Sequence, residues 1–168
     1  MEEGYREVSC VDGIVMRKIF AAVAAVFVLV AAGMSFAEET KSLKVGEYSV
    51  TVPASYVNGE VTDEEKAQGQ TAYYKSDEIL MDFDVYEFPK DEAFEDFVMS
   101  FAAPNLTRET INGVNAAVYR STDESDGQEY STLNYIIDGE KGYVFMVFWL
   151  DGEDAEPKAK AIIDSLKK

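Results

Sequence analysis

The chain has 168 residues with 32 acidic and 15 basic side chains and no histidine, so its formal net charge is −17. This length fits a single domain, and the negative charge argues against a nucleic-acid partner, whose phosphates are bound by Lys and Arg. The missing histidine excludes Ser-His-Asp and Cys-His catalysis and every His-ligated metal site.

The N-terminal region has the three parts of a secretory signal peptide. Met16-Arg17-Lys18 provides a positive start, residues 19–32 are uninterruptedly apolar, and a small-x-small site ends at Ala37, directly before Glu38. We expect cleavage after Ala37 and export to the periplasm or the extracellular space, with no membrane attachment afterwards. The alternative is an uncleaved anchor, because the apolar stretch extended to Ala37 approaches the ~20 residues that span a bilayer.

Residues 1–15 do not fit in front of such a signal, because they carry net negative charge where a signal peptide is positive. We therefore expect Met16 to be the biological start and 1–15 to be a disordered start-site overcall. The mature protein is then a single globular domain, 38–168, and it excludes Cys10, the only cysteine. An exported domain without a disulfide depends on its hydrophobic core for stability.

The mature domain begins with strand patterns. Residues 44–52 alternate between apolar and polar side chains, which predicts one strand that Pro53 ends. Thr62-Asp63-Glu64-Glu65 has the form of a capping box and predicts a short helical turn. Residues 71–75 and 79–88 then predict a pair of neighbouring strands.

The clearest helix in the middle of the chain covers 91–103. Asp91 is the expected N-cap, and Pro104 closes the helix. Burial of each Phe side chain contributes about 1.5–3 kcal/mol before entropy, so the apolar stripe is expected to pack against the core. The stripe consists of Phe94, Phe97, Val98, Phe101 and Ala102.

Two hairpins follow this helix. Asn112-Gly113, between 106–111 and 114–121, favours a type I′ turn, which needs positive φ at both central residues. The second hairpin joins 129–137 to 143–150 through a glycine-containing turn.

The last strand and the last helix decide the predicted architecture. Residues 143–150 are apolar at every position, so this strand should be central and covered on both faces. The helix predicted over 154–167 carries one apolar stripe, with acidic residues before it and lysines at its end, as the helix dipole favours. The prediction is an α+β fold in which an antiparallel sheet of about seven strands carries helices on both faces, a three-layer α-β-α sandwich.

Three segments of the mature chain together suggest a known family. They are Tyr48-Ser49-Val50-Thr51-Val52-Pro53, Ile111-Asn112-Gly113-Val114-Asn115-Ala116-Ala117 and Ala161-Ile162-Ile163-Asp164-Ser165-Leu166-Lys167. They resemble the opening strand, the hairpin and the closing helix of the PsbP/Mog-type superfamily, and the resemblance covers nearly all of the mature chain. One departure is Ser55-Tyr56, where many members have a tryptophan. Most members are binding or accessory proteins, so the resemblance implies a non-catalytic role in a bacterial envelope, and it carries over no functional residue.

Asp82 and Asp84 are the candidate metal ligands. They alternate within one predicted strand, so both side chains point to the same face, about 7 Å apart. Ca²⁺ and Mg²⁺ prefer oxygen ligands, which makes the pair a candidate cation site. The alternative is the charged outer face of an edge strand, where charge prevents edge-to-edge aggregation.

Four tyrosines are candidates for an exposed binding face, because tyrosine combines an apolar ring with a polar tip. They are Tyr48, Tyr56, Tyr86 and Tyr130.

The favoured function is an exported, non-enzymatic binding or accessory domain with an unidentified protein or small-molecule partner and no cofactor. One alternative is a protein that binds a divalent cation through clustered carboxylates. The other is a small hydrolase in which two carboxylates converge.

Overall fold

The structure is a computed structural model and describes residues 39–79, 81–125 and 127–168. The predicted start site and signal peptide, within 1–37, lie outside the described residues. Of the helices in the described ranges, none combines the length and the apolar character that crossing a bilayer requires.

Short strands and a few helices make up the described chain. They follow in the order β1 (Thr40–Val45), β2 (Tyr48–Pro53), β3 (Val57–Asn58), α2 (Asp63–Ala67), β4 (Gln70–Lys75), β5 (Met81–Pro89), α3 (Phe94–Ser100), β6 (Thr107–Ile111), β7 (Val114–Ser125), β8 (Gln128–Asp138), β9 (Gly142–Leu150) and α4 (Ala155–Asp164).

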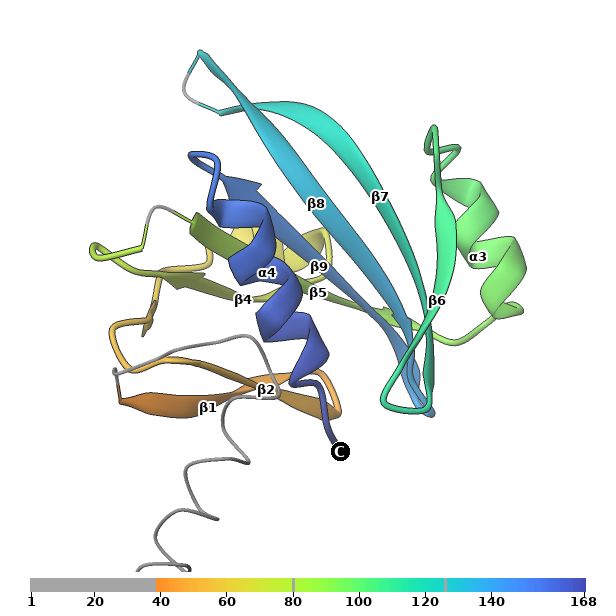
Figure 1. Ribbon diagram of the computed structural model, residues 1–168. Helices are drawn as coiled ribbons and strands as arrows, with labels where there is room; N and C mark the ends of the chain where they lie inside the picture. The colour runs from red at the N-terminus through yellow and green to blue at the C-terminus, as the bar shows by residue number, and fades with distance from the viewer. Residues whose placement is uncertain (1–38, 80, 126) are drawn as a thin grey trace, which may run out of the picture. The chain divides into compact units, whose positions relative to one another are not determined.

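The main sheet has seven strands in the order β3-β4-β5-β9-β8-β7-β6 (Figure 1), and all neighbours are antiparallel. β9 lies in the middle of this order, which confirms the central position predicted from its apolar side chains. β1 and β2 form a separate two-stranded sheet.

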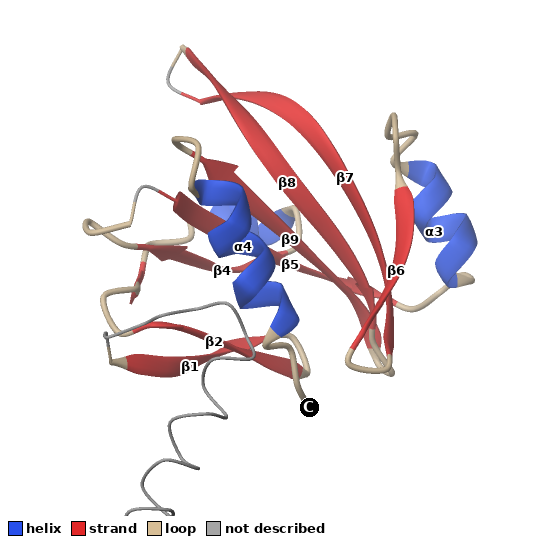
Figure 2. Cartoon of the chain, viewed as in Figure 1, coloured by secondary structure: helices blue, strands red, loops and turns tan. Residues whose placement is uncertain are grey.

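Helices lie on both faces of the main sheet, as Figures 1 and 2 show, and the predicted α+β fold is confirmed. The α4 face carries the larger core, to which β2 and the buried stripe of α4 contribute. The rings of Phe83 and Phe148 lie within this core, 5.1 Å apart. The stripe predicted for α4 is buried throughout, and its members are Ala155, Ala159, Ile162, Ile163 and Leu166.

The opposite face is covered only in part. A smaller apolar cluster packs α3 against β7, β8 and β9. Beyond this cluster, the same face carries polar residues that are nevertheless buried, among them Asp84, Thr132 and Asn134. The candidate site lies in the half of this face away from α3, where α2 contacts β4.

Two turns agree with the sequence prediction. The capping box of α2 is present, with Thr62 and Glu65 each accepting a hydrogen bond from the other's backbone N–H. Asn112 and Gly113 have φ of 50° and 86°, as a type I′ turn requires.

Residues 44–52 do not form one strand. Gly46 adopts a φ of 63° and reverses the chain, so that 44–45 close β1 and 48–52 belong to β2. The prediction failed because the alternation continues across the turn. Val45 on one side of the turn and Tyr48 on the other both face the core.

α3 is shorter than the predicted helix 91–103. It begins at Phe94, after Ala93 as an N-cap that offers no side-chain hydrogen bond, so Asp91 is not the cap. At the other end Ala102 has a φ of 46° and lies outside the helix. Three apolar side chains of the predicted stripe still pack in the α3 cluster with Val98, namely Phe94, Phe97 and Phe101.

Candidate functional site

The half of the sheet face away from α3 holds both aspartates that the sequence singled out. Asp82 and Asp84 lie on β5, which pairs with β4 on one side and β9 on the other. β5 is therefore an interior strand, and the alternative interpretation as the outer face of an edge strand is wrong. The sheet register places Trp149 opposite Asp82, and Tyr73 opposite Asp84.

Asp84 is a buried carboxylate, with 7% of its surface exposed. Its Oδ1 accepts a hydrogen bond from Nε2 of Gln70 at 2.7 Å, and its Oδ2 accepts one from Nε1 of Trp149 at 2.6 Å. Both donors are neutral, and none of the ion pairs within the described ranges includes Asp84. Since buried charges in proteins are normally paired, the negative charge of Asp84 lacks a cationic partner within the described chain.

This environment changes the acidity of the group. Burial raises the pKa of Asp84 to about 6, and the negative charges of Glu65 and Asp82 act in the same direction. The hydrogen bonds from Trp149 and Gln70 oppose the shift, because they stabilise the charged form. Asp84 is therefore mostly ionised at neutral pH and becomes protonated in mildly acidic solution.

Asp82 is half-buried and is held in place by its neighbours. The hydroxyl of Tyr73 donates to its Oδ2 at 2.5 Å, and the backbone N–H of Ser76 donates to its Oδ1 at 3.4 Å. Burial raises the pKa of Tyr73, and the hydrogen bond to Asp82 adds to the effect. Tyr73 consequently remains a donor to Asp82 at physiological pH.

Two adjoining hollows, of about 320 Å³ and about 380 Å³, open around these aspartates. They share Asp82, Tyr130 and Trp149, and we call them together the acidic trough. The first is completed by Glu60, Glu65, Gln70, Tyr73 and Asp84. The second is completed by Ser76, Asp77, Ile79, Met81 and Asp151.

The shared wall of the acidic trough is aromatic. The rings of Tyr130 and Trp149 meet edge to face, with centroids 6.1 Å apart, and both side chains are half-buried. Thr132, opposite Trp149 on β8, is buried and accepts a hydrogen bond from Asn134. The trough thus combines carboxylates and aromatic rings on one face of the sheet.

The four candidate tyrosines do not form one exposed face. Tyr48 and Tyr56 are 3% and 0% exposed and belong to the core on the α4 side, so the expectation of exposure is wrong for both. Their hydroxyls instead donate to buried backbone carbonyls. Tyr86 is half-buried on the α3 face, and Tyr130 is the one member of the four that lines the trough.

Asp82 and Asp84 share a face, as predicted, but they are not joined there by a third close ligand. Among the described residues, no three Asp, Glu, Cys or His side chains come together in a group that could hold a metal ion. The carboxylates of the acidic trough are spread along it, whereas a divalent cation needs its oxygen ligands at one point.

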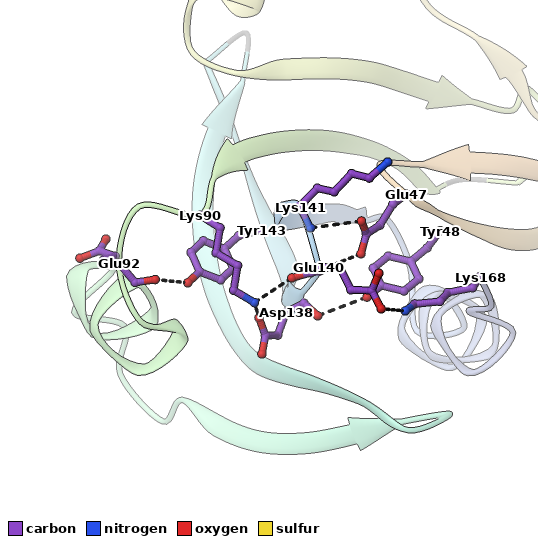
Figure 3. Close-up of polar contacts among 10 residues, drawn as sticks. Glu47, Tyr48, Lys90, Glu92, Asp138, Glu140, Lys141, Tyr143 and Lys168 are labelled. Carbon is purple, nitrogen blue, oxygen red and sulfur yellow. Dashed lines mark hydrogen bonds and ion pairs between the residues drawn. The ribbon is translucent and has the colours of Figure 1, made fainter.

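A third hollow, of about 770 Å³, lies beside the turn between β8 and β9. Figure 3 shows two ion pairs at this turn and the bonds of Glu47 to the turn's backbone. Lys90 donates to Asp138 at 2.6 Å, and Lys168 pairs with Glu140. Glu47 accepts from the backbone N–H of Glu140, which lowers the pKa of the Glu47 carboxyl. These contacts tie the turn to β1–β2 and to the C-terminus, so we interpret them as structural.

Several residues of the trough were not predicted from the sequence. Tyr73 and Trp149 were expected only as strand residues, and neither Gln70 nor Glu60 was singled out. Trp149 carried one usable signal, because it is the only tryptophan of the sequence and stands near the end of the predicted strand 143–150. The position of Glu60 near Asp84 is set by the path of the chain between β3 and α2, which no local pattern indicates.

Comparison with known proteins gives the fold. No protein-family model matches the sequence, and no curated protein matches it either. The fold is similar to the solution structure of cyanobacterial PsbP (CyanoP) from Synechocystis sp. PCC 6803, with a TM-score of 0.57 and 10% identity over 79% of this chain and 94% of that one.

A crystal structure of a protein from Bacteroides thetaiotaomicron matches equally well, with a TM-score of 0.58 and 12% identity over 77% of this chain. The match covers 48% of the Bacteroides chain, so this chain spans about half the length of that relative. Identities this low are informative about fold alone. The predicted resemblance is confirmed at that level: the chain has a PsbP-like fold.

Proposed function

We propose that this protein is an exported, non-enzymatic binding domain and that the acidic trough is its binding site. The observation that carries the proposal is Asp84, a buried carboxylate without a cationic partner in the described chain, at the wall of an open hollow. A protein that maintains such a group gives up stability, because desolvation of a charge is unfavourable. A bound cationic group would recover that free energy.

Two observations support a role without catalysis. The chain has no histidine, and both oxygens of Asp84 already accept hydrogen bonds from protein donors. Export is supported by the signal-peptide pattern of 16–37.

Binding can be tested with the single tryptophan of the chain, Trp149, as an intrinsic probe of the trough. The full-length protein is titrated with amines, amino acids, sugars and divalent cations while tryptophan emission and thermal stability are recorded. The proposal predicts that at least one class shifts the emission and raises Tm, and that Asp82→Asn weakens both effects. If no class shifts the emission, the trough is not a binding site.

Export and the lack of catalysis have separate tests. N-terminal sequencing of the protein recovered outside the cytoplasm should begin at Glu38. Prolonged incubation with whichever compound binds should leave that compound chemically unchanged. A protein retained with 1–15 intact, or a product formed from the bound compound, would contradict the corresponding part of the proposal.

A small carboxylate-dependent hydrolase is the second candidate. One observation favours it: Asp84, with its pKa raised to about 6, shares a face with Asp82, and carboxyl groups with separated acidities can divide the roles of acid and base. A screen against hydrolysable substrates decides the matter. Turnover that Asp82→Asn and Asp84→Asn both abolish would establish the hydrolase and overturn the non-enzymatic assignment.

A further inference from the structure

We propose that two copies of this chain associate edge to edge, through antiparallel pairing of residues 120–124 of β7 with the same residues of a second copy around a two-fold axis at Thr122. The main sheets of the two copies then continue into each other. This inference concerns an edge of the sheet and does not depend on the acidic trough.

β7 is longer than the strand that covers its outer side. β8 pairs with β7 from Ala116 to Ser125, whereas β6 pairs with it only from Val114 to Val118. Among the described elements, only these two strands make extensive contacts with β7. Figure 1 shows the β7–β8 hairpin projecting beyond β6. From Tyr119 onward, the outer side of β7 therefore has no neighbouring strand within the described chain.

The β6–β7 hairpin shows which backbone groups face this open side. Ile111 and Val114 flank its two-residue turn, so they exchange the hydrogen bonds that close the hairpin. Since the direction of these bonds alternates along a strand, every second residue from Val114 directs its N–H and C=O toward the β6 side. Beyond the end of β6 these residues are Arg120, Thr122 and Glu124, and no turn or loop of the described chain bonds to their backbone groups.

A two-fold axis at Thr122 makes this edge complementary to itself. In the antiparallel pair, Arg120 of each copy lies opposite Glu124 of the other, and Thr122 lies opposite its own counterpart. The three side chains project to the same face of the sheet, because side chains in a strand alternate with a period of two. Opposite charges directly across two strands stabilise the pairing. The backbone groups that face outward between 120 and 124 then all find partners in the second copy.

The two charged side chains are positioned for this contact. Arg120 is exposed and pairs with Glu156 of α4 on its own chain, with its Nε at 3.1 Å from the carboxylate. Glu124 is exposed and forms no ion pair within the described ranges. Because a guanidinium has five N–H donors, Arg120 can keep Glu156 and also contact Glu124 of the second copy.

Neighbouring registers of β7 lack this complementarity. An axis at Arg120, Asp123 or Glu124 places two like charges directly opposite each other, which destabilises the pair. An axis at Ser121 places Glu124 opposite Val118, whose backbone groups already pair with β6. Thr122 is therefore the axis that both the charges and the free length of the strand favour.

β6 has a free outer side as well, but it offers no comparable register. It is the terminal strand of the main sheet among the described residues. An axis at Arg108 or Glu109 again places like charges opposite each other. An axis at Thr107 or Thr110 brings no opposite charges together. The charge pattern thus selects the open part of β7 over β6.

The pairing is expected to be weak and reversible. The contact is short, as in transient complexes, and each chain has a net charge of −17, so two copies repel each other at low ionic strength. We therefore expect a dimer that forms at about 0.1–1 mM protein and dissociates on dilution.

Sedimentation equilibrium of the full-length protein at about 0.15 M salt measures this association. Glu124→Arg places two cations opposite each other and should weaken association by about tenfold or more. Glu129→Arg is the matched control and should not weaken it, because Glu129 is also exposed but lies across from Glu124 on β8, away from the open side. Thr122→Pro removes an outward N–H and spares the β7–β8 ladder, so it should weaken association too. Circular dichroism verifies that each variant is folded.

Oxidative cross-linking locates the axis. In a Cys10→Ser background, which lacks the only native cysteine, Thr122→Cys introduces a thiol at the proposed axis. Hydrogen-bonded partners in an antiparallel pair have Cα atoms about 5.5 Å apart, a separation that a disulfide spans. Oxidised glutathione should therefore convert Thr122→Cys into a covalent dimer. Thr110→Cys, at an exposed position of β6, should remain largely monomeric.

Three results would overturn the inference. One is a protein that stays monomeric at about 1 mM. Another is association that Glu124→Arg and Thr122→Pro leave unchanged, as contact through the apolar residues 19–37 would produce, or that Glu129→Arg weakens equally. The third is cross-linking of Thr110→Cys in preference to Thr122→Cys. Because the trough takes no part in the pairing, each of these results leaves the proposed binding function standing.

Discussion

Substitution of Asp84 by Asn tests the account of the trough most directly. The side chain keeps its size and loses its charge. Its amide oxygen can still accept from Nε1 of Trp149, and its amide N–H can donate to the side-chain oxygen of Gln70 once that amide rotates. The hydrogen bonds therefore survive, and the substitution isolates the effect of a buried charge.

The magnitude follows from linkage. The pKa of Asp84 is raised from 3.8 to about 6 in the folded protein, so the folded state holds this proton more tightly than the unfolded state. The free energy of unfolding must then fall as the pH rises through the interval between the two values. At about 1.4 kcal/mol for each pH unit, the whole change is about 3 kcal/mol, of which about 2 kcal/mol falls between about pH 4.5 and about pH 7.5.

The assay is urea denaturation of the wild type and of Asp84→Asn at these two pH values, followed by circular dichroism. The rest of the chain is identical in the two proteins, so the difference between their unfolding free energies reports the loss of the Asp84 charge together with its coupling to Glu65 and Asp82. That difference should move by about 2 kcal/mol in favour of the variant at the higher pH, and Asp96→Asn, the same change at an exposed acid on α3, should show no such movement. If the wild type and Asp84→Asn keep a constant difference across this interval, Asp84 is not a destabilised buried carboxylate.

Three further substitutions test the fold around the site. Phe148→Ala removes a fully buried ring from the core and should lower the unfolding free energy by about 3–5 kcal/mol in urea denaturation; a loss below about 1 kcal/mol would contradict the packing. Tyr56→Phe removes the 2.6 Å hydrogen bond to the carbonyl of Met81 and should cost about 0.5–1.5 kcal/mol, seen as a lower Tm. Asn112→Gly retains the positive φ and loses two 2.9 Å bonds to carbonyls at the end of α4, so it should destabilise by about 1 kcal/mol. Asn112→Ala, which also strains the turn, should destabilise more, and the reverse order in chemical denaturation would refute the assignment of the turn.

Local patterns in the sequence were sufficient for the layered fold. An apolar side chain at every position of 143–150 requires cover on both faces, whatever the neighbouring strands are, so β9 had to be central. Asn112-Gly113 specifies its turn through backbone sterics alone. Such features need no knowledge of distant residues.

The errors arose where a local pattern is compatible with two structures. The alternation of 44–52 is the same whether the chain runs straight or reverses at Gly46, and only the positive φ in the structure decides between them. The expected exposure of Tyr48 and Tyr56 was wrong because a tyrosine can enter a core whenever its hydroxyl finds a carbonyl to accept its hydrogen bond. For Tyr48 the alternation with Val50 and Val52 was a sign of burial.

The sequence by itself determined that Asp82 and Asp84 share one face, because side chains in a strand alternate with a period of two. Only the tertiary structure decided what surrounds them. Gln70 and Trp149 reach Asp84 from strands β4 and β9, and Glu65 approaches from α2. The physical reason is that burial and electrostatic environment depend on the register between strands far apart in the chain, and that register is set by the packing of the whole core.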